Sequence, residues 1–212
     1  MNIGVIGTGN MGTGLAKAWS AKGHKVLLGS RDPAKAKKLA PTLGKNVTGG
    51  SIAEAAKHGD VVLLAVHWPA VPGALKAAGD LKGKTLIDCT NPLTSDFMGL
   101  VIGHTTSGGE EVAKLAKGAT VVKAFSAVTA QVIHSSPLFG REAATVLYCG
   151  DDAGAKKTVA SLISDIGFDP VDNGGLQNAR FLEPLAVALV HLAYPMGMGP
   201  EKTAFKVLRR PG

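Results

Sequence analysis

The chain has 212 residues, of which 45% are hydrophobic and 18% are charged. This composition is typical of a globular, enzyme-sized domain and excludes a disordered or fibrous chain. The formal net charge of +7 suits an anionic cofactor. Because the lysines are spread over several predicted helices and only 5% of the residues are aromatic, the charge favours a solvated basic surface over a nucleic-acid-binding face.

The first predicted elements are a buried strand over residues 2–6, a glycine-rich turn and a helix over 13–21. The turn carries Gly-x-Gly-x-x-Gly, the spacing that holds the pyrophosphate of a dinucleotide. Gly7 permits the tight turn, Gly9 lets the backbone approach the phosphates, and Gly12 lets the helix pack against the strand. A purely structural turn is the alternative, but the flanking strand and helix favour an anion on the helix N-terminus.

The second predicted strand, residues 24–29, ends where the coenzyme is selected. An NAD site places Asp or Glu here for the ribose hydroxyls, whereas this chain has Ser30 and Arg31. A hydroxyl and a guanidinium suit a 2′-phosphate, and Lys35 adds a second positive charge. Asp32 is either a displaced acid of an NAD site or the N-cap of the helix that opens at Pro33. Together these residues predict NADP(H).

Strands and helices alternate through the following residues, which predicts an α/β fold with a Rossmann-type, doubly wound, mainly parallel sheet. The helix that begins after Ser51 carries a capping box, and the apolar residues 60–66 indicate a strand buried on both faces. The other predicted strands cover 46–48, 85–89, 120–125 and 144–149, and the other helices cover 33–43, 110–117 and 153–166.

A helical C-terminal extension departs from this alternation, with a helix predicted over 174–192. We expect a single domain over 1–212, in which 1–150 form the dinucleotide-binding core and 151–212 complete the acceptor pocket. The helix is more apolar than a surface helix needs, so it is expected to pack across the sheet edge or against the second subunit of a homodimer. The most apolar stretch, 184–198, is too short for a membrane span, and the first strand begins without a signal peptide, so we expect a cytoplasmic protein with no membrane partner.

Ligands of such sheets bind beyond the carboxyl ends of the strands. Polar or small residues follow three predicted strands there, and they are the expected neighbours of the nicotinamide and its ribose: Val66, His67, Trp68, Asn91, Pro92, Ser126, Ala127 and Val128. His67 is a candidate acid or base, but no relay partner is evident and a packing or cofactor-edge role is preferred. The histidines lack metal spacing, and Cys89 and Cys149 lack a Cys-x-x-Cys partner, which predicts buried free thiols and no metal.

The chain resembles the NADP oxidoreductases that depend on coenzyme F420, a 5-deazaflavin. The resemblance covers essentially the whole chain and rests on the 7–12 turn, on Gly29-Ser30-Arg31 with Lys35, on the Cys149-Gly150-Asp151-Asp152 turn, and on 178–183 leading to 197–199. It implies a pyrophosphate held by Thr8, Gly9, Asn10 and Met11, and a 2′-phosphate held by Ser30, Arg31 and Lys35. It also implies a deazaflavin pocket lined by Met196, Gly197, Met198 and Gly199.

The chemistry that this resemblance implies is direct hydride transfer between nicotinamide C4 and deazaflavin C5, held about 3–3.5 Å apart. No side chain need be a nucleophile or a base, so no catalytic residue is predicted. The Lys-x-x-Asn-Asn of β-hydroxyacid dehydrogenases and the Tyr-x-x-x-Lys of short-chain dehydrogenases are missing, and pyrroline-carboxylate reductases need a longer helical C-terminus.

Two alternatives stay open. One is a soluble NADPH-dependent flavin or ferric reductase that uses FMN or FAD, and the other is a non-catalytic NADPH-binding protein. This chain has Ala-Phe-Ser-Ala over residues 124–127, whereas relatives that reduce metals through a bound flavin have a segment similar to Ala-Phe-Asn-Thr there. The residues therefore specify the hydride acceptor less firmly than the hydride donor.

Overall fold

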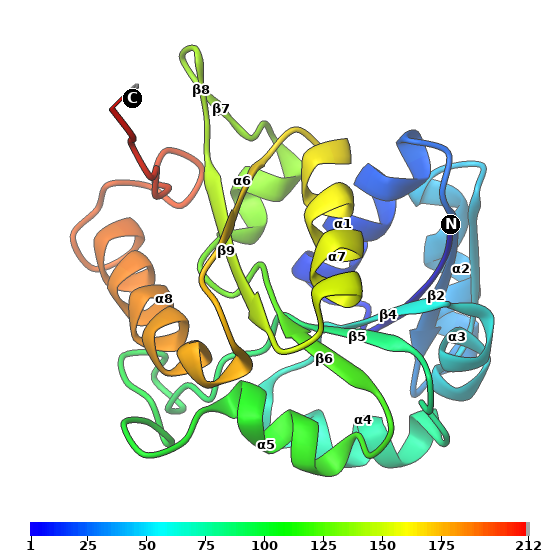
Figure 1. Ribbon diagram of the computed structural model, residues 1–212. Coiled ribbons are helices and arrows are strands. Elements are labelled where there is room, and N and C mark those ends of the chain that lie inside the picture. The colour runs from blue at the N-terminus through cyan, green and yellow to red at the C-terminus, as the bar shows by residue number, and fades with distance from the viewer. Residues whose placement is uncertain (211–212) are drawn as a thin grey trace.

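A twisted eight-stranded sheet with helices on both faces forms the centre of the molecule in the computed structural model, which describes residues 1–210 (Figure 1). The strand order is β10-β9-β6-β5-β4-β1-β2-β3. Strands β1 to β6 run parallel, β9 is antiparallel to β6, and β10 is parallel to β9. The strands of the sheet are β1 (Asn2–Ile6), β2 (Lys25–Ser30), β3 (Val47–Ser51), β4 (Val61–Leu64), β5 (Thr85–Asp88), β6 (Thr120–Lys123), β9 (Thr145–Gly150) and β10 (Asp169–Asp172).

The helices form a layer on each face of the sheet. One apolar core lies against α1 (Asn10–Ala21), α6 (Ala130–His134) and α7 (Ala153–Asp165). The other lies against α3 (Ile52–His58), α4 (Val71–Ala78) and α5 (Gly108–Leu115). The remaining elements are α2 (Pro33–Leu43), the short 3-10 helices η1 (Trp68–Ala70) and η2 (Leu176–Asn178), a hairpin of β7 (Leu138–Phe139) with β8 (Glu142–Ala143), and α8 (Ala179–Ala193).

The predicted doubly wound, mainly parallel sheet is confirmed, and so is the capping box. Ser51 accepts from the Glu54 backbone N–H at 3.2 Å, while the Glu54 carboxylate accepts from the Ser51 N–H at 2.6 Å. The chain passes from β1 outward to β3 and then returns to β4 on the other side of β1. The carboxyl ends of β1 and β4 are therefore the point where the strand order reverses, which is where folds of this kind bind dinucleotides.

The structure corrects two predicted helix boundaries and adds a strand, β10, that the sequence did not predict. Helix α1 begins at Asn10 rather than at residue 13, because its first turn lies inside the glycine motif. The helix expected over 174–192 begins only at Ala179, since Gly174 has a positive φ of 89° and η2 intervenes. The sequence does not predict β10, because Asp-Pro-Val-Asp is too polar and belongs to an edge strand paired with β9 alone.

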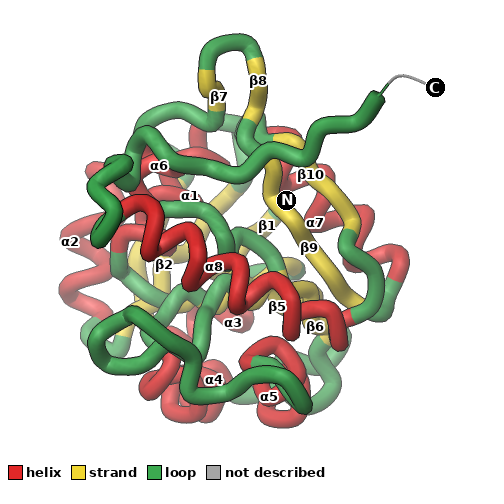
Figure 2. Tube along the Cα trace, turned by 90° about the vertical axis from the view of Figure 1, so that its left-hand side faces the viewer, coloured by secondary structure: helices red, strands yellow, loops and turns green. Residues whose placement is uncertain are grey.

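Helix α8 lies outside the two helical layers, in front of the carboxyl edge of the sheet (Figure 2). It runs between the loop that precedes α5 and the C-terminal tail, as Figure 2 shows. Pro184 lies inside the helix, in its second turn, where it lacks the backbone N–H that would donate to the Arg180 carbonyl. No helix within residues 1–210 has both the length and the apolar character needed to cross a membrane.

Candidate dinucleotide site

The glycine turn between β1 and α1 has the backbone that a dinucleotide site requires. Gly7 has a positive φ of 124°, and a Cβ there would overlap the Ala65 carbonyl. A Cβ on Gly12 would overlap the Gly7 carbonyl, so this glycine serves the close packing of α1 on the turn. Gly9 differs from both, since a Cβ on it would meet no atom within 4 Å. The absence of a side chain at Gly9 keeps open a space above the start of the helix.

The N-terminus of α1 faces this open space without a protein cap. Its N-cap residue is Gly9, no side chain caps it, and its first turn holds no acidic residue. Asp32, Ser51 and Asp152 by contrast cap α2, α3 and α7 through their side chains. The first backbone N–H groups of α1 are therefore available, together with the positive end of the helix dipole, for an anion.

The end of β2 lies beside the glycine turn, because the Gly7 N–H donates to the Gly29 carbonyl at 3.0 Å. Arg31 and Lys35 are exposed there, and neither takes part in an ion pair among residues 1–210. Asp32 is the N-cap of α2, and its Oδ1 accepts from the N–H groups of Ala34 at 3.0 Å and Lys35 at 3.3 Å. The cap interpretation of Asp32 is thus confirmed, which leaves two cations for a 2′-phosphate.

A cavity of about 210 Å³ begins at the first turn of α1 and continues to α8. Residues after β5 and β6 form one wall, and α6 and α8 form the others. Its lining brings together five residues predicted from the sequence, namely Asn10, Met11, Asn91, Ser126 and Val128. The lining residues that the sequence did not single out are Cys89, Phe125, Thr129, Ala130, Gln131, Ala186, Leu189, Val190 and Tyr194.

Two buried polar atoms in this cavity lack a partner. The Asn91 side-chain Nδ2 donates to the Ser126 backbone carbonyl at 2.9 Å, which fixes the amide with its Oδ1 as an unused acceptor. The Ser126 Oγ is the second atom without a hydrogen bond. A buried polar atom left unpaired costs about 1–3 kcal/mol, so a ligand that pairs with both atoms gains about that amount for each atom. Within residues 1–210 these are the two buried side-chain atoms in this condition.

The turn that presents Ser126 is strained. Phe125 has a φ of 61°, an unfavourable value for a bulky residue. Its buried ring packs edge to face on Trp19 and Phe168, with centroid distances of 6.0 Å and 6.4 Å. This packing holds the strained backbone and directs the chain after β6 toward the cavity.

The other predicted site residues lie at the rim or outside the cavity. The exposed His67 ring lies 6.2 Å from that of Phe97 between centroids, while Trp68 and Pro92 pack around Gly108. Val66 and Ala127 are half-buried beside the lining residues. The segment predicted to contact the acceptor, Met196 to Gly199, does not line the cavity. Its methionine side chains are exposed, Met196 at 63% and Met198 at 54%.

Helix α8 supplies a wall of the cavity that the sequence did not predict. Ala186, Leu189 and Val190 follow one another at helical spacing and face the cavity together with Tyr194. Their i, i+3, i+4 spacing predicts a common face of a helix. That face could have been identified from the sequence, but not the element against which it packs.

The cavity contains no reactive thiolate. Burial raises the pKa of the Cys89 thiol to about 12, and its Sγ donates to the Leu64 carbonyl at 3.3 Å. Burial likewise raises the pKa of Cys149 to about 12, and both cysteines are free, as predicted. Among residues 1–210 no three His, Cys, Asp or Glu side chains gather as metal ligands would.

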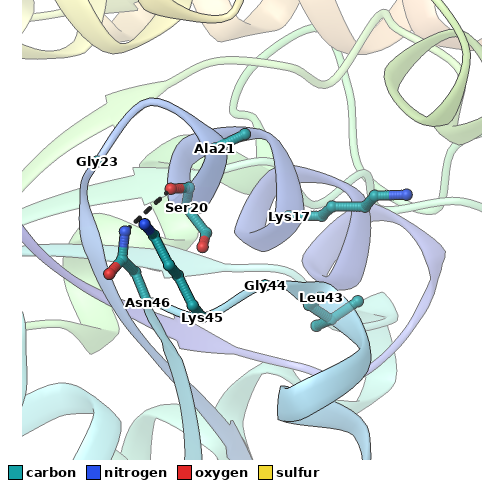
Figure 3. Close-up of a pocket in the computed structure, with 8 residues that line it drawn as sticks. All are labelled: Lys17, Ser20, Ala21, Gly23, Leu43, Gly44, Lys45 and Asn46. Atoms are coloured by element: carbon teal, nitrogen blue, oxygen red, sulfur yellow. Dashed lines mark hydrogen bonds between the residues drawn. The ribbon is translucent and has the colours of Figure 1, made fainter.

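A larger hollow of about 590 Å³ lies at the opposite edge of the sheet (Figure 3). It is formed where α1 and α2 end and β2 and β3 begin, and Asn46 Nδ2 donates there to the Ser20 carbonyl at 3.3 Å. Lys17 and Lys45 stand at its border, and Lys17 extends away from Ser20 in Figure 3. This hollow is remote from the carboxyl ends of the strands, so it is not part of the dinucleotide site.

The glycine turn, the uncapped helix and the cationic end of β2 are the features of a Rossmann-fold protein that binds NADP(H). The family model described as NADP oxidoreductase coenzyme F420-dependent matches residues 2–92. The F420-dependent NADP reductase of Methanothermobacter marburgensis is 31% identical over 208 residues, which cover 91% of this chain and 92% of that protein. The chain therefore belongs to the F420-dependent NADP oxidoreductase family, and it is an NADP(H)-dependent oxidoreductase.

Other similar proteins include longer ones and one of matching length. The metalloreductase STEAP3 of Rattus norvegicus is 33% identical over 188 residues, and the chain spans only 37% of its length. The crystal structure of a proposed F420-dependent NADP reductase from Arthrobacter sp. FB24 matches 99% of this chain with a TM-score of 0.88 and 30% identity. A reductive aminase from Aspergillus terreus, solved in complex with NADPH4, cyclohexanone and allyl amine, has a TM-score of 0.67 but 22% identity, so it supports the fold alone.

Proposed function

We propose that the protein transfers a hydride directly between NADPH and coenzyme F420. The observation that carries this proposal is the composition of the cavity. Among the described residues that line it there is no His, Lys, Arg, Asp or Glu, and its one thiol is held neutral. A cavity without an ionised acid, base or nucleophile suits a transfer between two bound rings, which requires alignment and exclusion of water.

The dinucleotide half of the site fits this proposal. The N–H groups at the start of α1 would bind the pyrophosphate, with Gly9 leaving space for it. Ser30, Arg31 and Lys35 would bind the 2′-phosphate at the end of β2. The arrangement supports the predicted residues Gly7, Thr8, Asn10, Met11 and Gly12 as the turn around the phosphates.

The two unpaired atoms of the cavity fit the carboxamide of a nicotinamide ring. Asn91 Oδ1 would accept from the carboxamide NH₂, and Ser126 Oγ–H would donate to its carbonyl. NADPH supplies a hydride from C4 of this ring when it is bound. Asn91 and Ser126 would orient the ring, while the apolar face of α8 would exclude water from the opposite side.

The acceptor side of the proposal rests on α8. Ala186, Leu189 and Val190 offer a small apolar surface suited to a flat ring, and the Tyr194 hydroxyl donates to Gln131 Oε1 at 3.2 Å across the cavity mouth. The exposed segment from Met196 to Gly199 continues this surface outward. It stays our prediction for the part of the pocket that contacts the acceptor.

The direct test mixes the protein with NADP⁺ and reduced F420 and follows the return of the deazaflavin absorbance. The reverse reaction, with NADPH and oxidised F420, should remove that absorbance. NADH at the same concentration is the control and should react more slowly. Absence of transfer in both directions, with NADPH binding intact, would contradict the proposal.

A flavin or ferric reductase is the second candidate, and the 33% identity to a metalloreductase favours it. It predicts turnover of NADPH with FMN or FAD, with or without ferric chelate, and no turnover with F420. A non-catalytic NADPH-binding protein would bind the nucleotide and reduce none of these acceptors. The same set of assays therefore separates the three hypotheses.

A homodimer in the cytoplasm remains part of the proposal. The side chains of Phe181, Tyr194, Met196 and Met198 lie exposed along α8 and the segment after it, with Phe181 at 69%. Exposed large apolar side chains are common at subunit interfaces. Light scattering at micromolar concentration should give the mass of two chains, and the mass of one chain would exclude this interface.

A further inference from the structure

Three ionised side chains are buried together beside the cavity, and the proposed chemistry does not use them. Lys123 is the last residue of β6, Asp88 is the last residue of β5, and Glu183 lies in the second turn of α8. Their exposed fractions are 0%, 0% and 1%. The Lys123 Nζ lies 2.9 Å from Asp88 Oδ2 and 2.8 Å from Glu183 Oε1, and it also donates to the Thr90 carbonyl at 2.5 Å.

Every oxygen of the two carboxylates is also satisfied. Asp88 Oδ1 accepts from the Thr90 N–H at 2.9 Å and from the Thr90 hydroxyl at 2.7 Å. Glu183 accepts from the N–H groups of Gly108 at 2.8 Å and Gly109 at 2.9 Å, at the start of α5. The second negative charge thus lies on the positive end of the α5 dipole. Desolvation lowers the Lys123 pKa, but the two carboxylates outweigh it and hold the pKa above its ordinary value, so Lys123 is charged.

This cluster contributes little to stability in comparison with apolar packing. Removing charges from water costs several kcal/mol for each ion, and apolar side chains of similar volume are often equally stable or more so. An ion cluster instead makes the arrangement of the surrounding segments specific, because its hydrogen bonds and ion pairs form in only one arrangement of the partners. The question is therefore which segments it holds in place.

The cluster joins the two walls of the cavity. Thr90 precedes Asn91, whose Oδ1 is one of the unpaired atoms, and Lys123 is three residues before Ser126, which carries the other. On the opposite wall, Glu183 is one helical turn before Ala186, the first α8 residue that lines the cavity. A turn of helix rises about 5.4 Å, so a rotation or shift of α8 at Glu183 displaces the wall at Ala186.

We propose that Asp88, Lys123 and Glu183 are positioning residues that fix α8 against the strand ends and thereby set the separation of the two rings during hydride transfer. The proposal rests on the proposed function for its consequence, because the α8 wall is assigned to the acceptor there. None of the three side chains lines the cavity. Their loss should therefore slow transfer and leave the dinucleotide site intact.

Glu183→Gln is the test variant, because it keeps the size of the side chain and leaves the pair of Lys123 with Asp88. A matched control is Glu110→Gln. Glu110 also joins α5 to α8, through Arg180 at 2.6 Å, but this pair is partly exposed and surface pairs contribute little. Three quantities are measured for each protein: kcat with F420 and with FMN as acceptors, the NADPH Kd by calorimetry, and hydrogen exchange of the amides in α8.

Glu183→Gln should lower kcat by up to about 100-fold, the cost of a displacement near 1 Å, with the NADPH Kd unchanged. Amides of residues 186–193 should exchange faster, while those of α1 keep their rates. Glu110→Gln should keep the wild-type kcat and NADPH Kd and should speed α8 exchange less than Glu183→Gln does. A wild-type kcat with wild-type exchange in α8 would overturn the proposal, and so would a parallel loss of NADPH affinity, which would place the role of the cluster in the dinucleotide site.

A variant without any of the three charges guards against a folding failure. If Glu183→Gln does not fold, Asp88→Asn/Lys123→Met/Glu183→Gln also removes the remaining buried ion pair and the cost of its desolvation. A folded triple variant with slow transfer and faster α8 exchange supports the proposal, and one equal to the wild type overturns it. If the wild type reduces neither acceptor, the proposed function fails, whereas the exchange comparison still decides whether the cluster positions α8.

Discussion

Substitution of Gly9 by alanine should separate nucleotide binding from folding. A Cβ on Gly9 would meet no atom within 4 Å, and its φ of −79° and ψ of 180° are accessible to alanine. Alanine has less conformational freedom than glycine in the unfolded chain, and this difference stabilises the folded protein by about 0.4–1 kcal/mol. Alanine is a poorer N-cap than glycine by a similar amount, about 0.5–1 kcal/mol. The two effects offset, so the Tm without ligand should stay within about 4 °C of the wild type.

NADPH binding should respond quite differently to Gly9→Ala. The methyl group would occupy the space through which a phosphate approaches the first N–H groups of α1. Loss of one hydrogen bond from a backbone N–H to a charged oxygen costs about 1.5–3 kcal/mol. That is about a 10- to 100-fold increase in the NADPH Kd.

Calorimetry with NADPH, together with thermal unfolding of the ligand-free protein, measures both quantities. The matched control is Gly73→Ala in α4, where a Cβ also meets nothing within 4 Å but no ligand is expected. It should gain up to about 1 kcal/mol of stability from helix propensity and keep the wild-type Kd. If Gly9→Ala binds NADPH as tightly as the wild type, the turn is not the pyrophosphate site and the reasoning from its open space is wrong.

Three further outcomes are expected. Arg31→Asp should weaken the binding of NADPH more than that of NADH, as measured by calorimetry. Lys38→Asp makes the same charge change and should affect the binding of both coenzymes only slightly. Equal losses of NADPH and NADH affinity in Arg31→Asp would contradict the assignment of Arg31 to the 2′-phosphate. The acetylpyridine analogue of NADP⁺ lacks the carboxamide NH₂, so it should bind to the wild type about tenfold more weakly than NADP⁺ does. Asn91→Ala should bind the analogue and NADP⁺ with equal affinity. A tenfold difference that persists in Asn91→Ala would exclude Asn91 from carboxamide recognition. The hydrogen bond from Arg180 lowers the pKa of Glu110, so this stabilisation is complete above the unfolded pKa of about 4.3 and is lost as the pH falls through the folded pKa. Urea unfolding should accordingly show Arg180→Met less stable than the wild type at pH 7, by a difference that shrinks as the pH falls below the unfolded pKa of Glu110. A difference that does not change with pH would contradict this pairing.

The dinucleotide half of the site could be predicted because its determinants are local. A strand, three glycines and a helix within the first 21 residues specify the turn, and Ser30 and Arg31 follow the next strand directly. The Asp32 cap and the Ser51 capping box also depend on neighbours within three residues. Interactions of this range are encoded by spacing alone.

The residues of α8 that line the cavity could not be predicted in the same way. The sequence favours the methionine segment after α8 for the acceptor, whereas Ala186, Leu189 and Val190 line the cavity in the folded protein. Their selection depends on the rotation of α8 about its axis. In the positioning role proposed above, Glu183 sets that rotation, and its partners Lys123 and Gly109 are 60 and 74 residues away in the chain.

The sequence by itself determined the doubly wound sheet, the glycine turn and the cationic residues at the end of β2, since each follows from hydrophobic period and residue type over short distances. Only the tertiary structure decided the antiparallel β9, the unpaired Asn91 and Ser126 atoms, and the buried ions that join β5, β6 and α8. The physical reason is that burial leaves a polar group with few compatible partners, and the chain must be folded before those partners are neighbours.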